Sequence, residues 1–218
     1  MSDLRELNPD TLRELCAQNG ELISEALQGA LETPFQFTTG EAAAWNADEL
    51  PDGLDGPGLI AALSAGEHAL LVAIPESLPL PGWYRRPSKS QNSRLQTLAM
   101  ELSPSLLPED VEPGDLNVVG VENLREALEA AAPDDAARML MLSPTADDAE
   151  NADAATTASP LMLAWPFSQP DALTERNVIT LAEEAPTAAA GEDASAASAP
   201  SAAASDAPAM ERPRGRLH

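Results

Sequence analysis

Histidine and cysteine, the side chains that most often perform catalysis or bind metals, are scarce in this sequence. The 218 residues include two histidines, His68 and His218, and one cysteine, Cys16. Neither histidine lies in a cluster with the spacing of metal ligands. No serine or cysteine stands in a motif typical of a catalytic nucleophile. The sequence therefore predicts no metal site, no cofactor and no catalytic residue.

The contexts of these few residues favour structural roles. The flanks of Cys16, "RELCAQ", predict a helix, in which a single cysteine is usually a small apolar core residue. An intrachain disulfide is excluded because there is no second cysteine. His68 stands at the start of an apolar run, and we expect a partly exposed histidine at a strand edge.

Carboxylates are abundant, and most of them are expected to be solvated surface. Glu101 is the most interesting acid, because it lies on a well-defined predicted helix, but one carboxylate on a polar helix face is ordinary. The acidic stretch "DDAENAD" lacks the alternating ligands and central glycine of a calcium loop. We expect it to be a loop exposed to solvent.

The segment "WYRRPSKSQNSR", residues 83–94, combines aromatic and basic side chains. It holds four of the 12 basic residues of the chain, among 36 acidic ones. Two interpretations are open: the cations keep a proline-rich loop hydrated, or the segment binds a partner, since Trp, Tyr and Arg are enriched at binding hot spots. We expect a docking loop for an acidic protein surface. Its candidate partner-binding residues are Trp83, Tyr84, Arg85, Arg86, Lys89 and Arg94.

The formal net charge of −24 narrows the classes of partner. Proteins bind nucleic acids and anionic lipids largely through Lys and Arg. A chain this acidic is therefore expected to bind neither. The longest apolar run, "ALLVAI", is far too short to cross a bilayer, and the N-terminus lacks the apolar core of a signal peptide. We expect a cytoplasmic protein whose partners are other proteins.

Apolar periodicity and helix-capping signals predict the helices and strands on which these residues lie. Asp10 is a plausible cap of the first helix, and Asn19-Gly20 can divide it in two. Ser93 and Gln96 match a capping box, and Pro104 is expected to kink or end the helix that follows. The predicted helices span 10–31, 93 to about 104 and 121–132, and the predicted strands span 34–39, 59–63, 68–74, 138–143 and 159–167. The glycine in "SAGE" predicts a hairpin between the second and third strands.

Three helices and about five or six strands without strict alternation predict an α+β fold with a mixed or antiparallel sheet. We expect one domain over residues 1–178. Residues 179–218 are rich in Ala, Ser, Pro and acid, a composition that predicts a disordered linker or tail.

The order of these elements resembles the amino-terminal, CheC-like domain of bacterial flagellar motor switch proteins of the FliM/FliN type. The resemblance covers about residues 10–175 and is carried by "GPGLIAALSAGEHALLVAIPESL", "WYRRPSKSQNSRLQTLAMELSPSLLPED" and "LMLAWPFSQPDAL". It implies a structural and signalling part of the cytoplasmic ring of the motor. In such proteins a linker commonly leads to a small all-β domain that builds the ring, and "MERPRGRLH" resembles the approach to one.

The CheC phosphatases related to this family carry a Glu and, three residues later, an Asn on a helix. Here the best match is Glu101, followed by Pro104, and a partial match is Glu25, followed by Gln28. Because the Asn is missing, we do not expect the hydrolytic activity.

The resulting hypothesis is a non-enzymatic protein-interaction module of the flagellar switch, acting in motility and chemotaxis at the periphery of the basal body. Two alternatives stay open: a phosphoprotein phosphatase that uses Glu101, and an acidic adaptor or chaperone of a secretion system.

Overall fold

Six strands and five α-helices follow one another without strict alternation in the computed structural model, which describes residues 3–32, 34–145 and 159–182. The α-helices are α1 (Pro9–Gln18), α2 (Gly20–Leu31), α3 (Lys89–Leu106), α4 (Leu124–Ala130) and α6 (Ala172–Glu175). The strands are β1 (Phe37–Ala44), β2 (Gly58–Ala65), β3 (His68–Pro75), β4 (Leu116–Val121), β5 (Pro133–Pro144) and β6 (Leu161–Phe167). Short 3-10 helices are η1 (Leu4–Glu6), η2 (Ala47–Glu49) and η3 (Asp52–Leu54). The expected α+β class is confirmed.

All six strands belong to one sheet in the order β1-β5-β6-β3-β2-β4, and every neighbouring pair is antiparallel. The two hairpin strands β2 and β3 pair in continuous register from Gly58 with Pro75 to Ala65 with His68. Gly66 stands at the turn with φ of 63°, the left-handed region that glycine adopts without strain. The predicted hairpin is therefore confirmed, and β1 and β4 form the two edges of the sheet.

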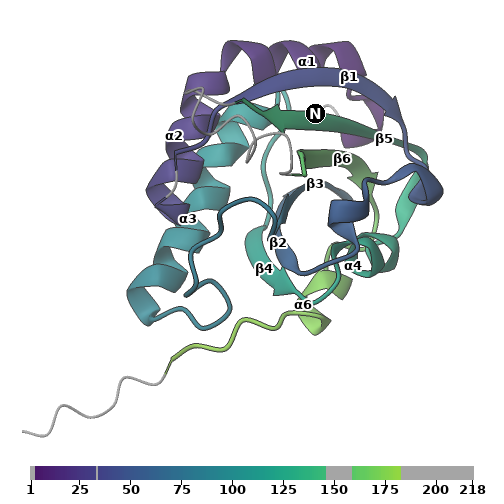
Figure 1. Cartoon of the computed structure of the whole chain (residues 1–218). Coiled ribbons are helices and arrows are strands. Elements are labelled where there is room, and N and C mark those ends of the chain that lie inside the picture. The colour runs from purple at the N-terminus through teal and green to yellow at the C-terminus, as the bar shows by residue number, and fades with distance from the viewer. Residues whose placement is uncertain (1–2, 33, 146–158, 183–218) are drawn as a thin grey trace, which may run out of the picture. The chain divides into compact units, whose positions relative to one another are not determined.

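Both faces of the sheet are buried, which explains the unbroken apolar runs of its central strands. Along β2, Leu59, Ala61 and Leu63 belong to one core cluster, whereas Ile60 and Ala62 belong to another. The first core lies under α1, α2 and α3, and the second lies under α4 and α6 (Figure 1).

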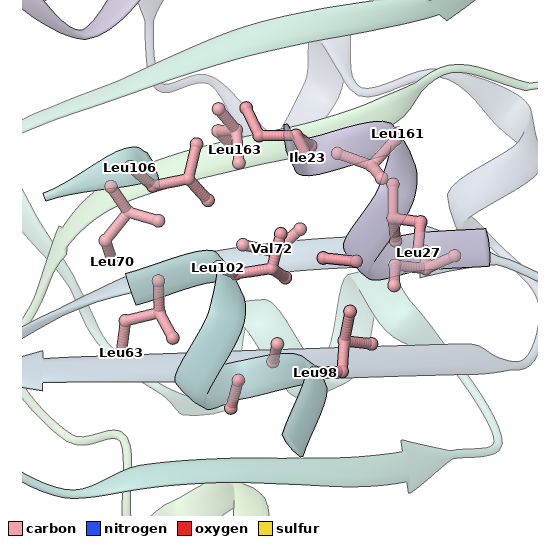
Figure 2. Packing of buried hydrophobic residues seen from close by; sticks show 14 of the residues in the cluster. Ile23, Leu27, Leu63, Leu70, Val72, Leu98, Leu102, Leu106, Leu161 and Leu163 are labelled. Atoms are coloured by element: carbon pink, nitrogen blue, oxygen red, sulfur yellow. The ribbon is translucent and has the colours of Figure 1, made fainter. Parts of the chain in front are cut away.

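Figure 2 shows the first core from close by. Side chains of α2 and α3 lie against those of the central strands. The labelled residues are Ile23, Leu27, Leu98, Leu102 and Leu106 from the helices, and Leu63, Leu70, Val72, Leu161 and Leu163 from the strands. This packing fixes α3, and with it the segment that leads into α3.

The start of α3 differs from the prediction. Ser88, not Ser93, caps the helix, and the capping box is formed with Gln91. The Ser88 amide donates to Gln91 Oε1 at 2.8 Å, and the Gln91 amide donates to Ser88 Oγ at 3.4 Å. Pro104 does not end the helix, which continues to Leu106.

Other boundaries also move. Asn8, not Asp10, caps α1, and the helix breaks at Asn19, which stands between α1 and α2, as the sequence allowed. The first strand starts at Phe37 and runs to Ala44, later than predicted. The predicted third helix begins too early, because Val121 ends the unpredicted strand β4 and α4 starts only at Leu124.

After α6 the chain still contacts the domain. The amides of Val178, Thr180 and Ala182 each donate a hydrogen bond to its backbone. The described domain thus extends past residue 178, where we expected it to end. The acidic loop "DDAENAD" and the expected tail from residue 183 onward lie outside the described residues. Within the described ranges, no helix is long and apolar enough to span a membrane.

Candidate partner-binding site

The candidate segment 83–94 does not form one loop. Residues 83–88 make a turn between β3 and α3, in which the amides of Tyr84 and Arg86 donate to the carbonyls of Pro81 and Trp83 at 3.0 and 2.9 Å. Residues 89–94 are the first turns of α3, because the helix starts at Lys89. The capped helix therefore holds one end of the turn firmly in place.

Tyr84 lies inside the domain, with 3% of its surface exposed. Its hydroxyl donates to Glu76 Oε1 at 3.0 Å and accepts a hydrogen bond from Arg85 Nε at 2.8 Å. Burial, the larger effect, raises the pKa of the Tyr84 hydroxyl, although the bond from Arg85 opposes it. Tyr84 thus anchors the turn and does not present its ring to a partner.

Arg85 is occupied by interactions within the domain. Its guanidinium carbon lies 5.5 Å from the centre of the Tyr84 ring, a cation–π contact. Its other nitrogens lie 3.4 Å from a Glu76 oxygen and 3.7 Å from a Glu122 oxygen. The hydrogen bond to Tyr84, followed by these carboxylates, raises the pKa of Arg85. Arg85 therefore braces the turn against β3 and the end of β4.

Trp83 and Arg94 meet at one carboxylate. Glu32, which follows the last residue of α2, accepts a hydrogen bond from Trp83 Nε1 at 3.5 Å and forms an ion pair with Arg94. The hydrogen bonds from Arg94 and then Trp83 lower the pKa of Glu32. Trp83 is half-buried against the first core. This cluster ties the turn and α3 to the end of α2.

Arg86, Lys89 and Arg94 are the exposed cations of the segment, and Arg94 is paired with Glu32. No carboxylate lies within ion-pair distance of the Arg86 guanidinium among residues 3–32, 34–145 and 159–182. Of the six candidates, only Arg86 and the outer part of Trp83 can contact a partner without disturbing the ion pairs and hydrogen bonds described above. The sequence could not separate them, because the paired carboxylates Glu32 and Glu76 come close only in the fold.

A second surface feature, a shallow groove of about 380 Å³ between α2 and α3, was not predicted. Its lining residues are Leu22, Glu25, Ala26, Gly29, Glu101, Pro104 and Ser105. Leu22, at 56%, and the nearby helical residue Met100, at 63%, are unusually exposed for large apolar side chains. The sequence held one sign of this groove, because Leu22 lies outside the periodic apolar face of its helix.

The groove brings together two glutamates that the sequence treated separately. Glu25 on α2 and Glu101 on α3 both line it. Three residues after Glu25 stands Gln28, which does not line the groove. Three residues after Glu101 stands Pro104, whose side chain has neither a hydrogen-bond donor nor an acceptor. The carboxylates are therefore present without the amide that the CheC phosphatases have at this spacing.

The surroundings of Cys16 and His68 indicate structural roles for both residues. Cys16 is fully buried, and burial raises the pKa of its thiol to about 12, as expected for an apolar filler. His68 is not partly exposed as predicted, because β3 is a central strand and the residue is 7% exposed. Its Nδ1 lies 3.0 Å from Asp3 Oδ1 without hydrogen-bond alignment.

Within the part of the chain that the structure describes, no three His, Cys, Asp or Glu side chains are grouped to hold a metal ion. No protein-family model matches the sequence, and no curated protein matches it either.

Proposed function

We propose that this chain is a non-enzymatic protein-interaction module of the bacterial flagellar motor switch, working in the cytoplasm at the basal body in motility and chemotaxis. The support is the resemblance of about residues 10–175 to the CheC-like domain of the switch proteins. An α+β domain with an antiparallel sheet agrees with that resemblance.

One observation carries the interaction role: exposed cations stand on a rigid support. Arg86 is exposed and has no ion pair among the described residues, while its neighbour Arg85 is fixed by Tyr84 and Glu76. A side chain on a pre-organised turn loses less entropy on binding than one on a loose loop. In so acidic a chain, these exposed cations lower the repulsion that an approaching acidic protein meets at this part of the described surface.

The test uses charge reversal on the full chain. Arg86→Glu/Lys89→Glu is compared with Arg13→Glu/Arg138→Glu, which makes the same change of charge at exposed positions of α1 and β5. Binding is measured against purified flagellar switch proteins of the same organism at several salt concentrations. Exposed interfacial charges act mainly through the association rate. We expect the first variant to associate about tenfold more slowly at low salt and with less salt dependence.

The control variant Arg13→Glu/Arg138→Glu separates a local effect of residues 86 and 89 from an effect of net charge. If both double variants slow association equally, only net charge matters and residues 83–94 are hydrated surface. If neither variant changes the kinetics, the docking role is wrong.

A phosphoprotein phosphatase is the second candidate, and one observation favours it: Glu25 and Glu101 line the same groove. We still expect no activity, because Gln28 and Pro104 cannot supply the missing amide at the groove. Phosphate release from a phosphorylated response regulator is measured with the wild type and with Glu25→Ala/Glu101→Ala. Acceleration by the wild type that disappears in the variant would establish the phosphatase and contradict the proposal.

A further inference from the structure

The segment that leaves α6 lies against the outer edge of β4. Residues 177–182, here named the strap, run past the start of α3 in Figure 1. The Val178 amide donates to the Gly120 carbonyl at 2.8 Å, and the Gly120 amide donates to Asn177 Oδ1 at 3.1 Å. The strap therefore satisfies both backbone groups of Gly120 that point away from β2.

Further along, the strap bonds to the turn before α3. The Thr180 amide donates to the Arg85 carbonyl at 3.0 Å, and the Ala182 amide donates to the Pro87 carbonyl at 3.0 Å. Together with Val178, these are alternate residues, so the extended strap donates every second amide, one to β4 and two to the turn before α3.

The side chains of the strap contribute little burial. Val178 and Ile179 are half-buried, and Ile179 packs on the first core, whereas Thr180, Leu181 and Ala182 are exposed. Leu181 is 49% exposed. A segment held by few hydrogen bonds and two half-buried side chains opens locally at much lower cost than the whole domain unfolds.

The fit of the strap depends on the absence of a side chain at Gly120. A Cβ built there would lie 2.9 Å from Ile179 Cγ1 and 3.7 Å from Val178 Cγ2. The backbone of Gly120 does not have positive φ. This glycine therefore allows the close approach of Ile179, and Val178 is in ordinary van der Waals contact.

We infer that the strap is a releasable cover over a strand-binding site, and that the site accepts an extended segment of a partner protein. The occupant has the chemistry of the strap itself: two adjacent branched apolar residues over Gly120, with free amides on alternate positions. Exposed strand edges bind extended peptides in this way. The inference rests on the strap contacts alone and does not depend on a role in the flagellar switch.

The test uses the full chain and a labelled, end-capped peptide with the sequence of residues 175–182, "ERNVITLA". Val178→Ser/Ile179→Ser removes the two half-buried side chains of the strap and leaves β4 intact. The triple variant adds Gly120→Ala, which fits the serine strap but collides with the isoleucine of the peptide. Hydrogen exchange at residues 178, 180 and 182 reports release of the strap.

We expect the double variant to bind the peptide at least about tenfold more tightly than the wild type, because the competing strap is released. The triple variant should lose this gain, and so should a peptide in which proline replaces the residue equivalent to Thr180.

Three results would overturn the inference. Equal peptide affinity of wild type and double variant would show that the strap covers nothing. A released strap without peptide binding would show that the edge accepts no partner segment. Unchanged exchange at the three amides in the double variant would show that the strap does not open.

Discussion

Arg85 and Arg86 are neighbours of the same type, yet the fold gives them different roles. Arg85 touches the Tyr84 ring and the carboxylates of Glu76 and Glu122, whereas Arg86 points its charge to solvent. The expected roles of the two arginines can be separated experimentally because each is a control for the other.

Arg85→Glu should destabilise the free domain, and Arg86→Glu should not. The first change removes the hydrogen bond to Tyr84 and places a third carboxylate beside Glu76 and Glu122. We expect a loss of about 1–2 kcal/mol in the free energy of unfolding, limited by the partial exposure of the site. The second change should stay within about 0.5 kcal/mol. Urea unfolding measures both, and equal losses would contradict the assigned contacts.

The contacts of Glu32 are expected to make the stability of the domain depend on pH. Its pKa is lowered from the ordinary value of 4.5 by Arg94 and Trp83, so its ionised form is favoured in the folded state. The stabilisation is therefore present above about pH 4.5 and is lost as the pH falls through the lowered folded value. The difference in Tm between the wild type and Glu32→Gln should shrink on acidification.

Arg94→Gln removes the same ion pair from the other side and should show the same trend. A Tm difference for Glu32→Gln that stays constant from neutral to strongly acidic pH would contradict the cluster.

For individual residues, the sequence showed where cationic and apolar side chains are concentrated, but it did not show which contacts each side chain makes. The concentration of cations in residues 83–94 was evident, and so was the apolar nature of Cys16. The pairing of Arg94 with Glu32 joins positions 62 apart in the chain. Such contacts depend on the packing of α2 beside α3, and no local pattern encodes them.

The start of α3 is the clearest lesson at the scale of elements. The sequence "SKSQNSRLQ" contains the Ser-x-x-Gln pattern twice, at Ser88 and at Ser93. Pro87 disfavours helical backbone at Arg86, so the helix is not expected to begin much before Ser88. Ser93 instead lies inside the helix, and its Oγ donates to the Lys89 carbonyl at 3.0 Å.

The two serines should therefore differ in their effect on stability. Ser88→Ala removes the cap and should lower the free energy of unfolding by about 1 kcal/mol. Ser93→Ala removes only a bond to a carbonyl within the helix and should change it by less than about 0.5 kcal/mol. Thermal or urea unfolding measures the difference, and the reverse order would support the cap predicted from sequence.

Strand β4 shows why an element can be missed. Its six residues, "LNVVGV", are short, contain a glycine and run into a helical pattern. Pairing with β2 stabilises the strand, and Gly120 allows the strap to approach on the other side. Neither partner is adjacent in sequence.

At the scale of the molecule, patterning was sufficient for the class of fold. The runs "LIAAL" and "HALLVAI" are apolar on both sides of the strand, and both faces of the sheet are indeed covered. The order of the strands and the groove between α2 and α3 depend on long-range packing, so the sequence alone did not provide them.

The most direct test of the docking claim is a photo-crosslink in flagellated cells. A photoreactive residue at position 86 is compared with one at position 13, which is exposed on α1 far from the turn in sequence. We expect a cross-link from position 86 to a flagellar switch protein, lost when Lys89→Glu is added, and none from position 13. Labelling of the same protein from both positions, or of no switch protein from position 86, would contradict it.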